Sequence, residues 1–191
     1  YRSYRFSRRS RRISAAEFVR MDKAGVFAPG ERLELLDGEI HTMSPIGPRH
    51  AFYVDLLVEL LSKNLPTRWR IRSQNPISLG PNDLPQPDIA IIRALDWSQQ
   101  HPGAGDIALV VEVADSSREF DLGEKRLYYA TRGIAELWIL DLVENRIEIS
   151  TGPSFRGYAN NRVVGHGETA ICQAVPEVAI AVSALFPGPT P

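Results

Sequence analysis

Three charged residues stand in or beside apolar segments, at positions that could serve catalysis. Asp88 begins the apolar run "DIAII", Glu112 lies inside "IALVVEVA", and Lys125 follows in "FDLGEKRLYYATRG". Carboxylates that project from two neighbouring strands can share a hard divalent cation and leave positions open for water and a phosphate oxygen. A lysine beside them can orient the attacking water and offset the charge that builds on phosphorus. Together these residues are the parts of a metal-dependent phosphodiesterase.

Each of the three residues also has an ordinary structural interpretation. Asp88 follows a proline and could simply begin a strand and cap a turn. Glu112 could form an ion pair with a lysine or arginine of the core, because a buried carboxylate needs a partner. Lys125 could be a solvated charge on a helix surface. Only the combination favours the catalytic interpretation.

The segments around these residues predict an α/β core. The apolar runs "PDIAII" and "IALVVEVA" are typical of strands covered on both faces. The segment "FDLGEKRLYYATRG" predicts a helix that is capped by Asp121 and ends at Gly133. The next two runs, "AELWILDL" and "RIEIST", predict a hairpin. After Ser154 we expect irregular structure, with a strand or two near residues 162–172.

The N-terminal half has clear local signals. "SAAE", from Ser14 to Glu17, is a capping box and predicts a short helix to about Ala24. "RLELLDGEIHTM" predicts a hairpin that turns at its Asp-Gly pair. Apolar residues at helical spacing predict a long helix over about 48–65. "WRIRSQNPISL" predicts an edge strand or a bulge, because it contains a proline. The whole order predicts a single α/β domain with a central mixed β-sheet flanked by helices.

Composition is that of a globular protein. The chain has 191 residues, 43% of them hydrophobic and 24% charged. Its single cysteine, Cys172, excludes an internal disulfide framework and favours a reducing, cytoplasmic location. We expect no membrane association, because the most apolar helical stretch, "AFYVDLLVELL", is short and broken by two acids. The arginine-rich start lacks the apolar segment of a secretory signal.

Charge is unevenly distributed along the chain. Residues 1–12 contain six arginines and no acid, so removing them from a net charge of −1 leaves −7 on the remainder. This segment is either a disordered, solvated tail or an arm that lies along phosphates. We therefore expect a basic, flexible arm over 1–12, a nuclease-like domain over 13–186 and a loose tail over 187–191.

The residues with catalytic potential lie within a longer pattern. The chain resembles the bacterial putative restriction endonuclease family of the PD-(D/E)XK nuclease superfamily over nearly everything from Ile13 to Phe186. The matching pieces, in order, are "ERLELLDGEIHTMSPIGPRH", "SQNPISLGPNDLPQPDIAII", "ALVVEVADSSREFDLGEKRLYYATRGIAELWILDL" and "VPEVAIAVSALF". The resemblance implies a restriction-endonuclease-like fold.

The resemblance also implies roles for individual residues. Pro87 and Asp88 correspond to the "PD" of the superfamily, and Glu112 to the acidic member of its second motif. Ala114 stands where the superfamily usually has its lysine, and the lysine is expected in the next helix, as Lys125. The implied cofactor is Mg²⁺, with Mn²⁺ as a substitute bound by the same two carboxylates. The implied partners are DNA and a second copy of the chain, because cutting two strands requires two sites.

Several further residues are candidates for supporting roles. Glu34 and Glu39 flank the predicted hairpin turn and either could add a third acid, with Glu39 preferred because it precedes the long helix. His50 begins that helix and could touch a bound water or a phosphate; otherwise it is a cap or a satisfied core group. Gln86 could orient substrate. Tyr129 lies one helical turn beyond Lys125 and could position it, or serve only as a core aromatic.

Other kinds of site are not supported. The sequence has no phosphate-binding P-loop, no dinucleotide fingerprint and no Cys/His spacing for zinc. "ADSS" supplies serines, but no histidine follows at a spacing that suggests a hydrolase triad, so we read Asp115 and Ser116 as a loop near the site. The sequence predicts a metal-dependent DNA endonuclease. The alternatives are a catalytically inactive nuclease fold for DNA binding or protein assembly, and a hydrolase of small phosphoesters or RNA.

Overall fold

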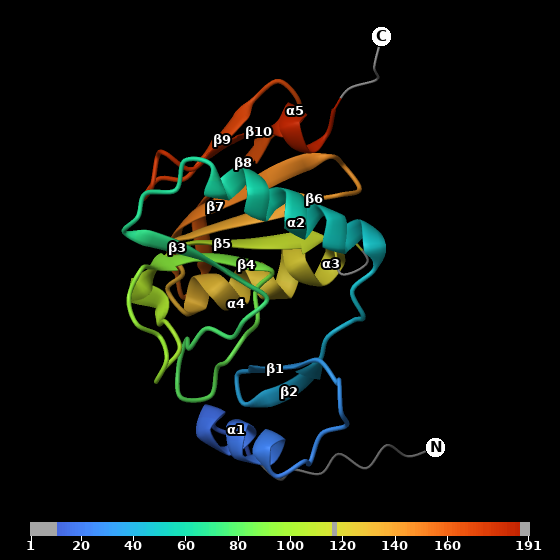
Figure 1. Cartoon of the computed structure of the whole chain (residues 1–191), viewed down its shortest axis with the longest axis vertical. Coiled ribbons are helices and arrows are strands. Elements are labelled where there is room, and N and C mark those ends of the chain that lie inside the picture. Colours follow the sequence, from blue (N-terminus) through green and yellow to red (C-terminus); the bar gives the residue numbers. More distant parts are fainter. Residues whose placement is uncertain (1–10, 116–117, 188–191) are drawn as a thin grey trace.

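A six-stranded mixed sheet forms the centre of the protein. The structure, a computed structural model, describes residues 11–115 and 118–187. The strands lie in the order β3-β4-β5-β6-β7-β8, and β5 and β6 are the one parallel pair of neighbours in this described sheet (Figure 1). Their bounds are β3 (Trp69–Ser73), β4 (Ile89–Arg93), β5 (Ile107–Ala114), β6 (Glu136–Asp141), β7 (Arg146–Ser154) and β8 (Gly157–Val164). The predicted α/β fold class with a mixed sheet is confirmed.

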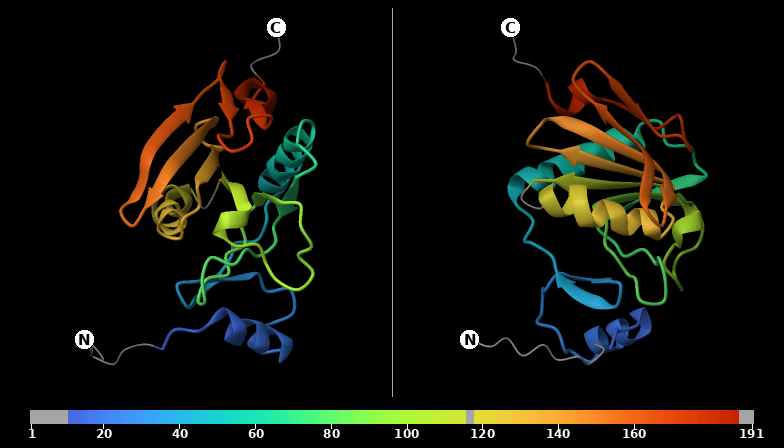
Figure 2. Two further views of the ribbon diagram at one scale, coloured as in Figure 1. Left: turned by 90° about the vertical axis from the view of Figure 1, so that its left-hand side faces the viewer. Right: turned by 180° about the vertical axis from the view of Figure 1, so that it is seen from behind.

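Helices cover both faces of the sheet (Figure 2). On one face lies α2 (Pro48–Ser62), whose buried Val54, Leu57 and Leu61 belong to the larger apolar core. On the other lies a continuous helical segment made of α3 (Arg118–Phe120), the π-helical η2 (Asp121–Lys125) and α4 (Arg126–Thr131). This segment links the parallel strands β5 and β6, because a parallel pair needs a crossover connection. No described helix is long and apolar enough to cross a membrane.

Burial on both faces explains why β4 and β5 are continuously apolar. Ile89, Ile91, Val111 and Val113 face the core beneath α2, whereas alternate residues of the same strands face α4. The predicted pair of doubly covered strands is therefore confirmed. Before β5, a short 3₁₀ turn, η1 (Ala104–Asp106), ends the connection from β4.

An N-terminal unit packs beside the end of the sheet from which β4 starts (Figure 1). It contains α1 (Ala15–Lys23), β1 (Leu33–Leu36) and β2 (Glu39–Thr42) around a small apolar core of its own. The predicted capping box is present at Ser14, and the hairpin turns at Asp37 and Gly38, both with positive φ. Leu35 and Leu84 exchange backbone hydrogen bonds, so β1 is tied to the segment that leads into β4.

Two predictions about helices and strands need correction. Asp121 does not cap the helix of α4: it lies in the π-helical segment, and the helix begins three residues earlier. The chain after Ser154 is more regular than expected, because β8 pairs along its length with β7 from Gly157 on. The expected strand or two near residues 162–172 is confirmed by the end of β8 and by a strand at Thr169–Ile171. Five of the eight residues of β8 are exposed in one unbroken run, polar and apolar alike, which removes the alternating pattern that identifies a strand. Beyond it lie β9 (Thr169–Ile171), β10 (Ala179–Ala181) and α5 (Val182–Leu185).

Other boundaries follow the expectations more closely. The helix α2 ends at Ser62, before the expected limit, and β3 is an edge strand that ends at Ser73, ahead of the proline. Of the expected basic arm, residues 1–10 lie outside the described residues, as do 188–191 of the expected tail. Arg12 is described and forms an ion pair with Asp37 in the hairpin turn.

A buried carboxylate joins the N-terminal unit to the helix on the far side of the sheet. Asp83 Oδ1 accepts hydrogen bonds from the backbone N–H of Asp37 at 2.7 Å and from the hydroxyl of Tyr128 at 3.0 Å. Arg132 adds an ion pair to the same oxygen at 3.3 Å. Three donors, one from the hairpin turn and two from α4 and its C-cap, therefore depend on one side chain, which fixes the hairpin relative to α4.

Replacing Asp83 should destabilise the protein substantially. Asp83→Ala leaves partly buried donors without an acceptor, so we expect the free energy of unfolding to fall by about 2–4 kcal/mol. Urea unfolding measures this loss. Asp55→Ala, which removes an exposed carboxylate from α2, is the matched control and should change stability by no more than about 0.5 kcal/mol. Equal stability of the two variants would contradict the role given to Asp83.

Candidate active site

The backbone of β4 and β5 places Asp88 and Glu112 side by side. Ile89 pairs with Val111 at the end of the antiparallel ladder, so Asp88, which directly precedes β4, comes next to Glu112 of β5. The N–H of Asp88 donates to Glu112 Oε2 at 3.4 Å, and the N–H of Val113 donates to Asp88 Oδ2 at 2.9 Å. Both carboxylates are buried. They are thus held by the same strands that carry them.

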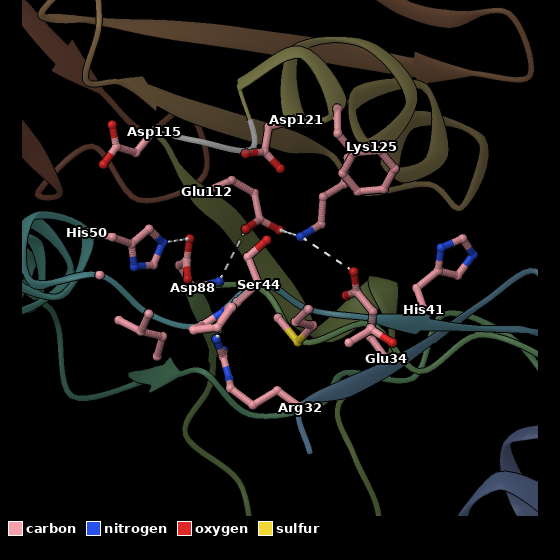
Figure 3. Close-up of a pocket in the computed structure, with 16 residues that line it drawn as sticks. Arg32, Glu34, His41, Ser44, His50, Asp88, Glu112, Asp115, Asp121 and Lys125 are labelled. Atoms are coloured by element: carbon pink, nitrogen blue, oxygen red, sulfur yellow. Dashed lines mark hydrogen bonds and ion pairs between the residues drawn. The ribbon is translucent and has the colours of Figure 1, made fainter. Parts of the chain in front are cut away.

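Lys125 reaches this pair from the helical segment (Figure 3). Its Nζ lies 3.0 Å from Glu112 Oε1 and 3.9 Å from Glu34 Oε1, and its side chain is almost completely buried. Lys125 ends the π-helical turn η2, and such turns occur frequently at functional sites. A lysine stem from the helix therefore does reach the strand that carries Glu112.

Tyr129 contacts the site differently from the sequence expectation. Its hydroxyl donates to Glu112 Oε1 at 2.6 Å, so it holds the carboxylate that also binds Lys125. Tyr129 is fully buried and thus serves the core as well. Its position one turn beyond Lys125 brings both side chains to the same oxygen.

Glu34, rather than Glu39, is the third acid at the site. Glu34 is buried in β1, lines the cleft and approaches Lys125, whereas Glu39 is exposed at the start of β2 and does not line the cleft. The preference for Glu39 was wrong: the pairing of Glu34 with His41 and of Leu36 with Glu39 puts both glutamates on the same face of the hairpin, but Glu39 lies beside the turn, away from the residues that line the cleft. The N–H of Gln86 donates to Glu34 Oε2 at 3.2 Å and fixes it.

The other candidate residues divide between the site and its supports. His50, at the start of α2, has Nε2 at 3.0 Å from Asp88 Oδ2 and is half-buried. The Gln86 side chain instead donates to the Leu33 carbonyl at 2.8 Å and does not line the cleft. Asp115 lines the cleft and pairs with Arg49 at 3.3 Å. Ser116, read together with Asp115 as a loop near the site, lies outside the described residues.

These side chains line one open cleft of about 610 Å³ between the N-terminal hairpin and the sheet. Asp121, from the π-helical segment, was expected only as a helix cap, but it is buried and faces the same space (Figure 3). The charged and histidine residues of the lining are Arg32, Glu34, His41, His50, Asp88, Glu112, Asp115, Asp121 and Lys125. Five acids therefore share the cleft with two fully charged bases.

The excess of acids shifts the ionisation of the site. Burial raises the pKa of Glu112 to about 8, and Asp88 and Asp121 add to this rise against the opposing effect of Lys125. Burial also opposes the charge on Lys125, but Glu112, Glu34 and Asp121 together raise the pKa of its ammonium. The site thus keeps a charged lysine and, below about pH 8, one proton on Glu112.

Asp88 and His50 form a second coupled pair. Burial disfavours the Asp88 carboxylate, but the hydrogen bond to His50 and the Val113 N–H hold its pKa below its ordinary value. The same hydrogen bond to Asp88 raises the pKa of His50. At a pH at which Glu112 still carries its proton, Asp88 is therefore ionised.

The proton on Glu112 gives a testable pH dependence. In the unfolded chain the pKa of a glutamate is about 4.5, so between about pH 5 and pH 8 the folded protein binds one more proton than the unfolded chain. The Glu112 contribution to stability should then fall as pH rises, by at most about 1.4 kcal/mol per pH unit. The raised pKa of His50 acts in the same direction.

Urea unfolding with a chelator present, at several pH values in this range, checks the prediction. Glu112→Gln cannot titrate and should show a clearly flatter dependence than the unsubstituted protein. A stability that rises with pH in the unsubstituted protein, or equal slopes in both, would contradict the assigned ionisation.

The donor chemistry of the site fits a hard divalent cation. Within residues 11–115 and 118–187 there is no preformed group of three or more His, Cys, Asp or Glu side chains that could hold a metal ion. Magnesium, however, usually takes only one or two protein carboxylates and keeps several waters. Asp88 and Glu112 supply two adjacent oxygen donors, and the surplus of acids in the cleft favours a cation. They are the residues that would hold it.

Comparison with known proteins places the chain in a family. Residues 15–183 match the Uma2 family, described as putative restriction endonuclease. The chain belongs to this family. No curated protein matches it significantly. Among solved structures, it is similar to a crystal structure of a putative nuclease belonging to DUF820 from Anabaena variabilis, at 14% sequence identity and a TM-score of 0.71.

The structural similarity extends over nearly the whole fold. It covers 91% of this chain and 97% of the Anabaena protein, so the sheet and its flanking helices belong to one shared architecture. At this level of identity the comparison bears on the fold alone. Membership of the Uma2 family confirms the family resemblance identified from the sequence motifs.

Proposed function

We propose that this member of the Uma2 family is a metal-dependent endonuclease that hydrolyses DNA phosphodiester bonds. The observation that carries the proposal is the position of Asp88, just before β4, beside Glu112 of β5, whose Oε2 accepts the Asp88 N–H at 3.4 Å, with Lys125 Nζ 3.0 Å from Glu112. An ordinary ion pair would explain Glu112 and Lys125 alone. It does not explain a second buried carboxylate and a third acid, Glu34, in the same open cleft.

The residues of the site would divide the work of hydrolysis. Asp88 and Glu112 hold the cation, which when bound supplies Lewis-acid polarisation of a phosphate oxygen. Lys125 stays protonated, so it donates to the attacking water or to the phosphate oxygen that gains charge, and it does not act as a base. His50 and Tyr129 keep the two carboxylates in fixed orientations through their hydrogen bonds.

DNA is the proposed substrate because of family membership together with the cleft. The family is described as putative restriction endonuclease, and an open cleft gives a polymer backbone room to approach the carboxylates. A dimer remains a prediction for this chain, since cutting both strands needs two sites. Sedimentation of the purified protein measures its mass in solution and tests this prediction.

A catalytically inactive module for DNA binding or protein assembly is the second candidate. It is favoured by Ala114, which stands in β5 where the superfamily pattern usually has its lysine. The two functions differ in metal affinity. Calorimetric titration with Mn²⁺ should show binding to an active site, whereas a silent scaffold need not bind the metal.

A supercoiled-plasmid assay tests the proposed activity. With Mg²⁺ or Mn²⁺ the full chain should convert supercoiled plasmid to the nicked circle, and excess chelator should stop the conversion. The nicked circle identifies internal cleavage, because an exonuclease has no end to act on. An absence of nicking with both metals, together with no metal binding by calorimetry, would overturn the proposal in favour of the silent module.

A further inference from the structure

One cation of the cleft is not used by the carboxylates. Arg32 precedes β1, and its carbonyl accepts the N–H of Met43 at 2.8 Å, which extends the hairpin pairing and fixes the backbone. Its guanidinium donates from Nη1 to the carbonyl of Ser44 at 3.2 Å. Figure 3 shows the side chain directed toward the space in front of Asp88 and Glu112.

The other strong cations at the cleft are already paired. Lys125 contacts Glu112 and Glu34, and Arg49 pairs with Asp115 and donates to the Leu142 carbonyl at 2.6 Å. Among the residues that the structure describes, Arg32 has no ion pair with a carboxylate, although five acids line the same cleft. Its charge is therefore available to an anion that enters.

Arg32 also shares the cleft with Asp88. His50 and Glu112 line the same cleft. The guanidinium and the carboxylate pair thus belong to one electrostatic environment. A phosphate that reached Asp88 would have Arg32 on the hairpin side and Lys125 on the helix side (Figure 3).

We propose that Arg32 binds a phosphate of the DNA backbone at the mouth of the cleft, an inference that rests on the proposed function. An acidic cleft repels a phosphodiester, and an unpaired cation reduces this repulsion in addition to any metal. Arginine suits this task because its planar fork donates two parallel hydrogen bonds to phosphate oxygens. The Ser44 carbonyl accepts a hydrogen bond from Nη1 of the guanidinium, and the other N–H groups remain available to the substrate.

Fluorescence anisotropy of a short labelled DNA duplex, titrated with the full chain in Ca²⁺ at several salt concentrations, tests the proposal. Arg32→Ala should weaken binding about tenfold and make the slope of log affinity against log salt shallower by about 0.9, the loss of one phosphate contact. Arg32→Lys keeps a charge but loses the fork, so it should retain the slope and recover only part of the affinity.

Arg162→Ala is the matched control. Arg162 is an exposed arginine on β8, and its Nη2 donates to the Thr169 carbonyl at 3.3 Å, a contact like that between Arg32 and Ser44. Arg162→Ala removes the same charge from β8, and β8 and β3 are the two edge strands of the sheet. We expect wild-type affinity and slope. Thermal unfolding shows whether each variant is still folded. A folding defect would not change the salt slope by the amount expected for one phosphate contact.

The outcomes separate this inference from the proposed nuclease activity. Equal affinity and slope for Arg32→Ala and Arg162→Ala, or no binding of the duplex by the unsubstituted chain, would overturn the role of Arg32. If Arg32→Ala loses the phosphate contact while the unsubstituted chain nicks no plasmid, the inference stands and the catalytic proposal falls. If the unsubstituted chain nicks plasmid and Arg32→Ala binds the duplex with unchanged affinity and slope, the catalytic proposal stands and the inference about Arg32 falls.

Discussion

Asp88→Asn should reduce plasmid nicking by about three orders of magnitude or more, with the fold intact. The change keeps the shape of the side chain and an oxygen that can accept the Val113 N–H at the position where Asp88 Oδ2 accepts it at 2.9 Å. It removes one of the two charges that would hold the cation, and the loss of several kcal/mol of charge stabilisation corresponds to a rate loss of this size.

Two measurements check this prediction. Calorimetry with Mn²⁺ should show that metal affinity is lost in Asp88→Asn, and thermal unfolding should show a protein that is still folded. Asp55→Asn, an exposed position on α2, is the matched control and should keep wild-type nicking and metal binding. Nicking by Asp88→Asn at the wild-type rate would point to a contaminating nuclease or to a site elsewhere.

Lys125→Met should affect both activity and stability. We expect nicking to fall about 10²- to 10³-fold, the usual effect of losing one donor to a charge that develops in the transition state. Removal of the ammonium also leaves Glu112, which is buried in β5, without its cation. Above about pH 8, where Glu112 is ionised, breaking this buried ion pair on one side costs about 3–5 kcal/mol, so the free energy of unfolding should fall by that amount. At lower pH the protonated Glu112 loses only a hydrogen-bond donor, and the fall should be smaller.

A double variant separates the two effects of Lys125. Glu112→Gln with Lys125→Met replaces the buried pair by neutral groups, and it should recover most of the lost stability in urea unfolding while nicking stays absent. Lys63→Met is the control, because Lys63 forms an exposed pair with Glu59 on α2. That surface pair contributes only about 0.3–0.5 kcal/mol. A Lys125→Met protein as active as this control would remove Lys125 from the proposed mechanism.

Much of the fold could be predicted from the sequence because its local signals agree with the final structure. The capping box at Ser14, the turn at Asp37 and Gly38, and the apolar runs of β4 and β5 each specify an element without knowledge of its neighbours. The strand β8 could not be found in this way. It is an edge strand in which five residues in a row are exposed, polar and apolar alike, so its pairing with β7 leaves no hydrophobic pattern.

The candidate site was predictable where charge conflicts with burial, and not where the placement of the hairpin or a helical irregularity decides. Asp88 and Glu112 interrupt apolar strands, which identifies them in the sequence. The choice between Glu34 and Glu39 depends on which end of the hairpin borders the cleft, and the one clue to Glu34 is its place inside the apolar run "LELL". The approach of Asp121 depends on a π-helical turn, for which the sequence carries no recognised signal.

The most direct test of the account is a time course of supercoiled-plasmid nicking by the unsubstituted chain and Asp88→Asn, purified identically and supplied with Mg²⁺ or Mn²⁺. We predict nicked circle from the unsubstituted chain, none after addition of chelator, and none from Asp88→Asn at any time at which the reaction of the unsubstituted chain can be followed. Equal nicking by the two proteins, or nicking that persists in chelator, would contradict a metal-dependent nuclease site built on Asp88 and Glu112.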